Sequence, residues 1–342
     1  MAMDGVLDEA LEALSDRAPD FSNGNTNHAP MVAETLVTLG RSDVVLRWVD
    51  AYRRDVPERP SERPSVGADW REALGRRDLW PEWVSLFRRE LSEMPWQQAL
   101  DKWTGRLAAG LSGEATHGLI RTAHAVRALE LGASPLRLNE LADGLAYWAA
   151  GYHAFRAVPA SNQAYGLDEA LARVPMLAPD RSGNIDQTLR RLNDMPEFAP
   201  VIDSLAISDD PLADLSDLTR RFAAVYLANA DDPGATFAVV HAVTGPSALR
   251  LIAPYVSEAN QRLLVRYAWQ TAAAIYAVFA RERRAARGDA GAAARPLLIE
   301  AAVENGAAHA IKFVEACLRE YETKADSVFL AAAADAAVRL EG

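Results

Sequence analysis

The chain has 342 residues, of which half are apolar, and its formal net charge at pH 7 is −11. This composition is typical of a globular protein and excludes a collagenous or wholly disordered chain. The acidic balance argues against a nucleic-acid partner, because proteins that bind nucleic acids present basic surfaces to the phosphates. The single cysteine, Cys317, excludes an internal disulfide framework, and we expect it to be a small buried apolar residue.

The N-terminal segment MAMDGVLDEA is acidic and lacks the apolar region of a secretory signal. The longest apolar stretch, 267–280, is shorter than the roughly 20 residues that a membrane span requires. We therefore expect a cytoplasmic protein that has no membrane partner.

Helix-forming residues dominate the chain, and alanine alone accounts for 66 positions. Apolar residues recur at helical spacing in eight segments, and a ninth segment, 236–243, is apolar on all sides. The eight segments are 6–14, 32–39, 82–91, 119–131, 136–152, 215–227, 260–279 and 303–321. Alternating β-branched runs are nearly absent, so the sequence predicts an all-α fold.

Two stretches interrupt the helical pattern. Residues 56–69 are rich in proline, serine and charge, which is typical of a long exposed loop. Residues 158–211 contain many helix-breaking residues, and we expect a winding connection there. The prediction is a single large multi-helix domain over 1–342, built from an N-terminal half (1–157), this connection (158–211) and a C-terminal half (212–342).

The chain has six histidines, and most of them lie in apolar segments that are predicted to be helical. They are His28, His117, His124, His153, His241 and His309. One such residue alone is ordinarily a hydrogen-bonded core side chain. Several in one helical domain favour a shared purpose, because burying polar rings is costly. His241 lies in the segment that is apolar on all sides, so its ring needs a specific partner.

Lys312 is the second unusual residue, because the chain contains 33 arginines and only three lysines. It follows His309 by one helical turn, so both side chains can point into one cavity. Burial there would lower the lysine pKa and leave an amine that acts as a base or takes up CO₂ as a carbamate. The alternative is an ordinary lysine whose ammonium reaches solvent at a helix edge.

Familiar nucleotide and hydrolase motifs are absent from the sequence, as are the H-x-[DE] and H-E-x-x-H metal motifs. The one E-x-x-H motif runs from Glu114 to His117, whereas a di-iron site of the ferritin type needs two. Neutral imidazoles remain as ligands, and these suit iron, copper or zinc. A carbamylated Lys312 would supply the negative charge that such a buried site lacks.

Four segments carry a family resemblance: NHAPMVAETLVTLGR, THGLIRTAHAVRALE, FAVVHAVTGPSALRLI and NGAAHAIKFVEACLRE, in that order. Together they resemble the questin oxidase-like family over essentially the whole chain. The resemblance implies an oxygenase that cleaves rings of anthraquinone-type aromatic polyketides and uses a mononuclear non-haem iron. It also implies the ligands: the imidazoles of His28, His117, His241 and His309, and a carboxylated Lys312.

One block departs from the family pattern. The family usually continues H-G-L-I with a Gly-Tyr-Ala-Leu-like run, whereas this chain has Thr122-Ala-His-Ala-Val. His124 shares a helix face with His117 but lies about 10 Å further along the axis. We therefore expect His124 to touch the substrate or supply a proton rather than to bind the same ion. The expected pocket walls, for which core packing is the alternative, are His153, Trp148, Tyr152, Phe237 and Trp269.

The resulting hypothesis is that Fe(II) binds in a cavity between the two helical halves, with O₂ as co-substrate. His28 and His117 would come from one half, and His241, His309 and Lys312 from the other. A small phenolic or hydroquinone-type aromatic substrate would undergo C–C ring cleavage or Baeyer–Villiger-like oxygen insertion.

The sequence contains no nucleotide-binding fold for NADPH, so either the substrate is already reduced or a separate reductase acts upstream. Two other classes stay open, a zinc-dependent hydrolase with a carboxylated lysine and a non-catalytic helical scaffold. Nothing in the sequence predicts the oligomeric state.

Overall fold

A computed structural model describes residues 3–158, 164–177, 183–280 and 294–340. The predicted all-α fold is confirmed: these residues form helices joined by loops, and they contain isolated β-bridges but no strands. The chain divides into two compact units. Unit 1 comprises Met1–Tyr152 and Leu251–Val256, and unit 2 comprises His153–Arg250 and Ser257–Gly342. Unit 1 thus covers most of the predicted N-terminal half, and unit 2 contains the predicted connection.

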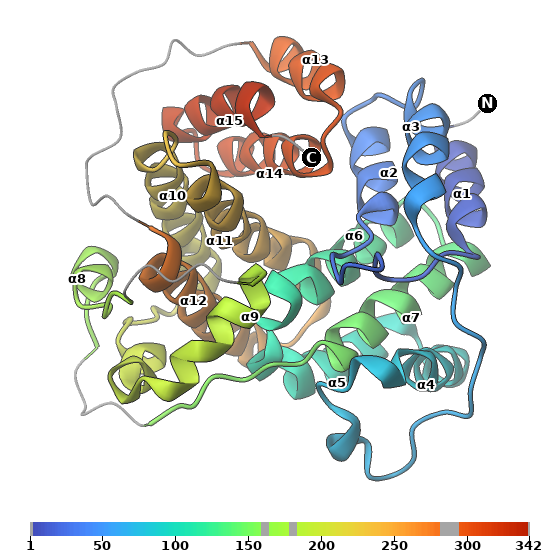
Figure 1. The fold of residues 1–342 in the computed structure, drawn as a ribbon, viewed down its shortest axis with the longest axis horizontal. Coiled ribbons are helices and arrows are strands. Elements are labelled where there is room, and N and C mark those ends of the chain that lie inside the picture. Colours follow the sequence, from blue (N-terminus) through green and yellow to red (C-terminus); the bar gives the residue numbers. More distant parts are fainter. Residues whose placement is uncertain (1–2, 159–163, 178–182, 281–293, 341–342) are drawn as a thin grey trace. The chain divides into compact units, whose positions relative to one another are not determined.

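Unit 1 is built around α7, which packs against both α6 and α4 (Figure 1). The three N-terminal helices pack on one another, and α2 also contacts α6. The α-helices of this unit are α1 (Met3–Leu14), α2 (Ala29–Thr38), α3 (Val45–Tyr52), α4 (Trp80–Glu93), α5 (Trp96–Leu107), α6 (His117–Glu130) and α7 (Pro135–Ala150). Short 3₁₀ helices connect them, namely η1 (Arg53–Asp55), η2 (Trp70–Ala73), η3 (Arg77–Leu79), η4 (Ala108–Gly110) and η5 (Gly113–Thr116), and η8 (Ala253–Tyr255) completes the unit.

The backbones of α6 and α7 touch at two glycines. A Cβ atom added to Gly118 would lie 2.4 Å from the Cα atom of Trp148. One added to Gly144 would lie 2.9 Å from the backbone nitrogen of Thr122. Because no side chain larger than hydrogen fits at either position, these glycines allow the close crossing.

Buried ion pairs reinforce α7. Arg121 of α6 donates to both carboxylate oxygens of Glu140, at 2.7 and 2.9 Å. Arg59, in the loop 56–69, donates to both oxygens of Asp143 at 2.7 Å. The loop is irregular and largely exposed, as predicted, and the Arg59 pair anchors one end of it to α7.

In unit 2, α14 packs against α13 and α15, and α10 packs against α12 and α15. Its helices are α8 (Leu167–Ala172), α9 (Ile185–Arg190), α10 (Pro211–Ala228), α11 (Pro233–Ile252, whose last two residues belong to unit 1), α12 (Glu258–Phe279), α13 (Arg295–Asn305), α14 (Ala308–Thr323) and α15 (Ser327–Arg339). Within the described part of the predicted connection 158–211, the chain forms α8, α9 and two 3₁₀ helices, η6 (Arg191–Asp194) and η7 (Pro196–Asp203), before α10 begins at Pro211.

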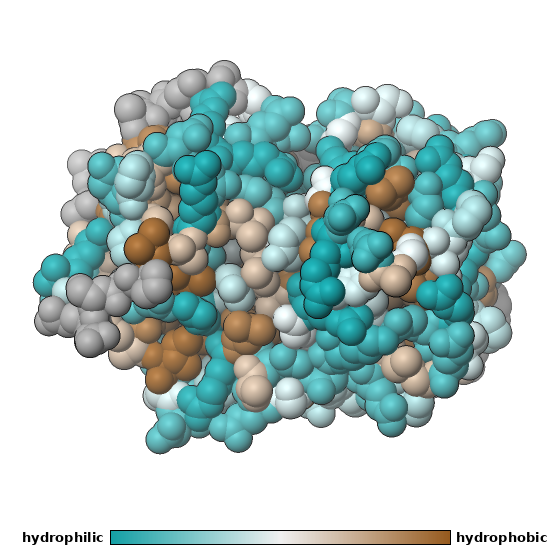
Figure 2. Space-filling view, turned by 90° about the horizontal axis from the view of Figure 1, so that it is seen from below, coloured by the Kyte–Doolittle hydropathy of each residue, from teal (hydrophilic) through white to brown (hydrophobic). Residues whose placement is uncertain are grey.

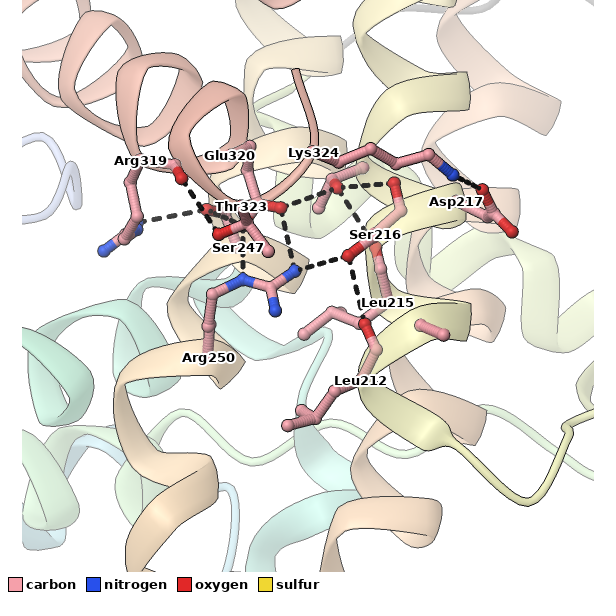
Figure 3. A network of polar contacts seen from close by, with 12 residues as sticks. Leu212, Leu215, Ser216, Asp217, Ser247, Arg250, Arg319, Glu320, Thr323 and Lys324 are labelled. Atoms are coloured by element: carbon pink, nitrogen blue, oxygen red, sulfur yellow. Dashed lines mark hydrogen bonds and ion pairs between the residues drawn. The ribbon is translucent and has the colours of Figure 1, made fainter. Parts of the chain in front are cut away.

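A buried carboxylate joins three helices of unit 2 (Figure 3). Glu320 of α14 has an exposed fraction of 0 %. It accepts hydrogen bonds from Ser247 Oγ at 2.7 Å and Thr219 Oγ1 at 3.1 Å. Arg250 donates to its two oxygens at 3.1 and 2.9 Å. Since a buried charge is tolerated only when it is paired and hydrogen-bonded, this network holds α10, α11 and α14 in register.

The prediction of one continuous helix over 303–321 is wrong. Gly306 has a φ of 75° and ends α13, and α14 begins at Ala308. Glycine adopts this left-handed conformation at a helix C-terminus at little cost, which stops the helix there. His309 is therefore the second residue of α14 instead of a mid-helix residue. The other predicted helices are confirmed with shifted ends. The prediction did not include α3, α5, α8, α9 or α15, and it included only the last three residues of α13.

Among the described residues, one helix is long and apolar enough to cross a membrane, Pro233–Tyr255. In this structure 89 % of its most apolar window is buried inside the protein, as in a core helix. Figure 2 shows one face of the molecule, on which hydrophilic residues predominate and hydrophobic residues form separate patches.

Gly118→Ala is expected to lower the free energy of unfolding by about 1–3 kcal/mol, because the new methyl group overlaps the backbone of α7. Gly5→Ala, in α1, is the matched control, since nothing lies within 4 Å of a Cβ at that position. Helix propensity alone makes this control neutral or stabilising by up to about 1 kcal/mol. Urea denaturation of both variants measures the difference, and equal stabilities would contradict the close crossing.

Candidate functional site

Two of the predicted ligand histidines form a pair in unit 1. The ring centroids of His28 and His117 lie 4.7 Å apart, with an interplanar angle of 76°. His28 directly precedes α2, and His117 is the first residue of α6. Both side chains are buried. The packing of α2 on α6 thus brings together two rings that are 89 positions apart in the sequence.

The backbone before His117 is strained. Glu114, Ala115 and Thr116 have φ values of 51°, 51° and 71°, and none of them is glycine. Left-handed backbone costs an ordinary residue about 1–2 kcal/mol, and such strain is concentrated at functional sites. The turn brings the Glu114 carbonyl oxygen within 2.6 Å of His117 Nδ1. Because a carbonyl only accepts, Nδ1 carries the hydrogen, and the lone pair of the neutral ring is on Nε2.

A polar network links this turn to the loop that carries His28. The Glu114 carboxylate pairs with Arg77 at 2.7 Å, and Arg77 also contacts Asp20 at 3.3 Å. Tyr147 donates to Asp20 at 2.6 Å, and its hydroxyl lies 2.8 Å from that of Thr26. Burial raises the pKa of Asp20 above its usual value, although Arg77 opposes the shift. The two histidine-bearing loops are therefore held by one set of contacts within unit 1.

The loop before α2 is fixed by its own side chains. Asn27 donates to the Ala18 carbonyl at 2.9 Å and accepts from the backbone of Ala29 at 3.0 Å. The backbone nitrogen of His28 donates to the Tyr52 hydroxyl at 3.2 Å. Burial raises the pKa of Tyr52 to about 12, so this hydroxyl keeps its proton at neutral pH. These contacts hold the backbone of His28 at the start of α2.

The second histidine pair lies in unit 2. His241 of α11 and His309 of α14 have ring centroids 5.2 Å apart, at an interplanar angle of 73°. Phe237, one turn before His241, packs edge-on against His309 at 4.6 Å. Its side chain is 39 % exposed, whereas both imidazoles are buried. Phe237 is thus the predicted wall residue that contacts the histidine pair of its own unit.

Burial lowers the pKa values of two basic groups at this pair. Burial lowers the pKa of His241 to about 4, and the nearby Lys312 ammonium contributes to the shift. Burial also lowers the pKa of Lys312 to about 7. His241 Nδ1 lies 3.3 Å from the Ala238 carbonyl, so its hydrogen is on Nδ1 and its lone pair on Nε2. At neutral pH the His241 imidazole is therefore uncharged and Lys312 is partly present as the uncharged amine, so each can offer a nitrogen lone pair to a metal ion.

The structure gives His124 a different neighbourhood. Its Nδ1 lies 2.6 Å from a carboxylate oxygen of Glu34 on α2, and Arg127 donates to both oxygens of the same carboxylate. Burial raises the pKa of Glu34, but Arg127 and His124 outweigh this effect and hold the pKa well below its usual range. The three residues form a buried cluster that joins α2 to α6, and the catalytic role of His124 stays a prediction.

The two predicted wall residues of unit 1 lie against glycines. The backbone of Trp148 lies against Gly118 at the α6–α7 crossing. The Tyr152 ring lies against Gly110, where an added Cβ atom would be 2.1 Å from it. Tyr152 therefore packs on the backbone of η4, and its role at a substrate stays a prediction.

The two remaining predicted wall residues lie in unit 2. His153 Nε2 lies 3.0 Å from the Asn193 amide nitrogen, and burial lowers the pKa of His153 to about 4. Trp269 is fully buried and donates from its indole nitrogen to the Val201 carbonyl at 2.8 Å. Their roles at a substrate stay predictions.

Sequence reasoning missed the polar residues that support the unit 1 pair. Arg77, Asp20 and Tyr52 occur in stretches without any recognisable motif. Glu114 was noticed only as part of an E-x-x-H motif, whereas its carboxylate pairs with Arg77. A left-handed turn without glycine leaves no sequence signal, because only its tertiary contacts make it possible.

Residues 25–317 of the chain match the Questin oxidase-like family. The chain belongs to the Questin oxidase-like family. No curated protein matches its sequence. Membership confirms the resemblance and makes this chain an oxidoreductase of the oxygenase kind that acts on an anthraquinone-type substrate. The matched region includes both histidine pairs and Lys312.

Ala115→Gly is expected to leave the free energy of unfolding unchanged or to raise it by up to about 1 kcal/mol. Relief of left-handed strain offsets the greater freedom of glycine in the unfolded chain. Ala51→Gly, at an exposed position in α3, is the control and should lose about 1 kcal/mol. Thermal and urea unfolding compare the two variants. An equal loss in both would contradict a strained turn before His117.

Proposed function

We propose that this member of the Questin oxidase-like family is a non-haem iron-dependent oxygenase. Its substrate would be an anthraquinone- or hydroquinone-type aromatic polyketide, which it attacks by C–C ring cleavage or Baeyer–Villiger-like oxygen insertion. The observation that carries the proposal is the presence of two buried imidazole pairs, His28 with His117 and His241 with His309. Burying four polar rings is costly, which favours a shared function over a purely structural role.

The donor chemistry fits iron. His117 and His241 have a backbone carbonyl at Nδ1, which leaves Nε2 as the ligand atom, an arrangement typical of metal-binding histidines. Nitrogen donors of this kind suit iron, and a carboxylated Lys312 would add an anionic oxygen. When bound, ferrous iron supplies the one-electron chemistry that lets dioxygen react with a closed-shell organic molecule.

The protein's own residues have three proposed tasks. His241 stays unprotonated well below neutral pH, so protons do not compete for its ligand atom. The Lys312 amine attacks CO₂, forms an N–C bond and releases a proton, which converts a neutral side chain into an anionic one. Phe237, partly exposed beside His309, offers an aromatic edge against which a planar substrate packs. Proton transfer at the substrate is the proposed task of His124.

Electron balance decides whether a reductase is required. If both atoms of O₂ enter the product during ring cleavage, no outside electrons are needed. Oxygen insertion uses one atom and reduces the other to water, which requires two further electrons. A hydroquinone substrate carries these electrons itself, whereas a quinone substrate requires a separate NADPH-dependent reductase. We propose a cytoplasmic enzyme that receives these two electrons either from a hydroquinone substrate or from a separate reductase.

The purified protein is expected to contain iron and to consume O₂ when a hydroquinone-type substrate is added. His28→Ala and His241→Ala should each lower the iron content, because each removes an imidazole ligand. His153→Ala is the matched control: it also removes a buried imidazole but should leave the iron content unchanged. Elemental analysis and an oxygen electrode provide the measurements.

Two results of these measurements would contradict the proposal. Stoichiometric zinc without O₂ uptake would favour a hydrolase that activates water with a carboxylated lysine. A metal content that neither histidine substitution alters, together with reduced stability, would favour a helical scaffold.

A carbamate on Lys312 should be detectable by ¹³C NMR after incubation with ¹³C-labelled bicarbonate. Only the unprotonated amine reacts with CO₂, and the Lys312 pKa is about 7. At constant dissolved CO₂ the signal should therefore grow as the pH rises through 7 and disappear below about pH 6. Lys312→Met should abolish it, whereas Lys324→Met, at an exposed lysine paired with Asp217, should not. A signal that persists in Lys312→Met would exclude this carbamate.

A further inference from the structure

Unit 1 contains a cavity of about 340 Å³ that none of the predicted site residues lines. Its walls come from the loop 56–69, η2, α4 and α5. The polar, charged and aromatic side chains in its lining are Ser65, Trp70, Arg89, Glu90, Trp103 and Arg106. The volume lies at the lower end of the range for small-molecule pockets, so a ligand of one or two fused rings fits.

Arg106 is the chemical centre of this cavity. Its guanidinium lies 4.9 Å from the ring centroid of Trp70 and 4.6 Å from that of Trp103. Trp103 is almost fully buried and Trp70 partly so. Although burial raises the pKa of the Glu90 carboxylate, hydrogen bonds from Lys102 and Trp103 lower this pKa below its usual value. The Arg106 charge contributes to the lowering. Indole walls remove water from this guanidinium, which strengthens its attraction for an anion.

The remaining charges leave the cavity locally positive. Arg89 adds a second guanidinium, which donates to Ser65 Oγ at 2.8 Å and lies 3.9 Å from a carboxylate oxygen of Glu93 at the surface. The only carboxylate in the lining, Glu90, accepts two hydrogen bonds from Lys102 at 2.7 Å and one from the indole nitrogen of Trp103 at 2.8 Å. Arg89, Lys102 and Arg106 therefore outnumber Glu90 and Glu93 around this cavity, although the whole chain has a net charge of −11.

The rim of the cavity is held in place by contacts between the loop and α4. Ser85 donates to the Arg63 carbonyl at 2.7 Å, and the Arg63 side chain pairs with Glu82 at 3.3 Å. Arg88 pairs with Glu62. Because the loop is already held in place, a ligand does not have to order it on binding, which lowers the entropic cost. The proline-rich loop thus forms a fixed wall of the cavity.

We propose that this cavity binds a planar aromatic anion, whose negative group contacts Arg106 and Arg89 and whose ring lies along the two indoles. Guanidinium groups pair with carboxylates and phosphates through charge-assisted hydrogen bonds. An aromatic carboxylic acid and an adenine mononucleotide both offer this combination. The site is separate in its residues from both histidine pairs, and it does not depend on the proposed oxygenase activity.

Isothermal titration calorimetry of the full chain tests the proposal with three probes: 2-naphthoate, the neutral 2-naphthamide and adenosine monophosphate. At least one anion should bind, and 2-naphthamide should bind much more weakly than 2-naphthoate. Arg106→Gln should weaken anion binding roughly tenfold or more, as expected for the loss of a charged hydrogen-bond donor. Arg71→Gln is the matched control, because Arg71 lies 4.4 Å from the Trp70 ring but does not line the cavity.

Arg89→Gln, at an exposed position, provides a second variant whose folding does not depend on the cavity, and it should weaken binding roughly threefold or more. Tighter binding of 2-naphthoate identifies an aromatic acid as the ligand, and tighter binding of the nucleotide identifies a phosphate ester. The proposal is overturned if neither anion binds or if the amide binds as well as the acid. It is also overturned if Arg89→Gln and a folded Arg106→Gln both leave the affinity unchanged.

Discussion

The contact between the backbones of α6 and α7 determines where His117 lies. Gly118 lies directly against the backbone of Trp148, so α6 cannot slide along α7. His117, the residue before Gly118, is therefore held at a fixed point. The chain reaches that point only through the left-handed turn at Glu114–Thr116. Glu114 in turn packs on Gly151, where a Cβ would lie 2.5 Å from its Cγ atom. Close packing thus compensates the backbone strain next to a proposed ligand.

In unit 2 a buried ion pair, and not a close backbone contact, fixes the helices that carry the histidine pair. The Glu320 carboxylate on α14 accepts hydrogen bonds from Arg250 and Ser247 on α11 (Figure 3). The same two helices carry His309 and His241. Because an unpaired buried carboxylate would cost several kcal/mol, the two helices have one favoured register, and that register brings the imidazoles within 5.2 Å of each other.

Burial also produces the chemistry of this pair. Desolvation lowers the pKa of His241 to about 4 and that of Lys312 to about 7. At neutral pH the imidazole is therefore uncharged, and the lysine is partly present as the uncharged amine. The half-buried Arg106 is a different case, because its guanidinium lies against two indole rings in the cavity for which we propose an anionic ligand. Unit 2 thus offers an uncharged imidazole and a weakly basic amine, whereas the cavity in unit 1 offers guanidinium groups.

The sequence by itself determined the helical class, the exposed loop 56–69, the burial of Cys317 and the family, because composition, periodicity and local motifs are properties of short segments. It also singled out four histidines that the structure joins in two pairs. Only the tertiary structure decided which rings meet, since contacts such as that between His28 and His117 connect distant segments. The break at Gly306 and the turn at Glu114–Thr116 likewise escaped the sequence. A glycine can end a helix or continue it, and a strained turn exists only because packing elsewhere compensates its cost.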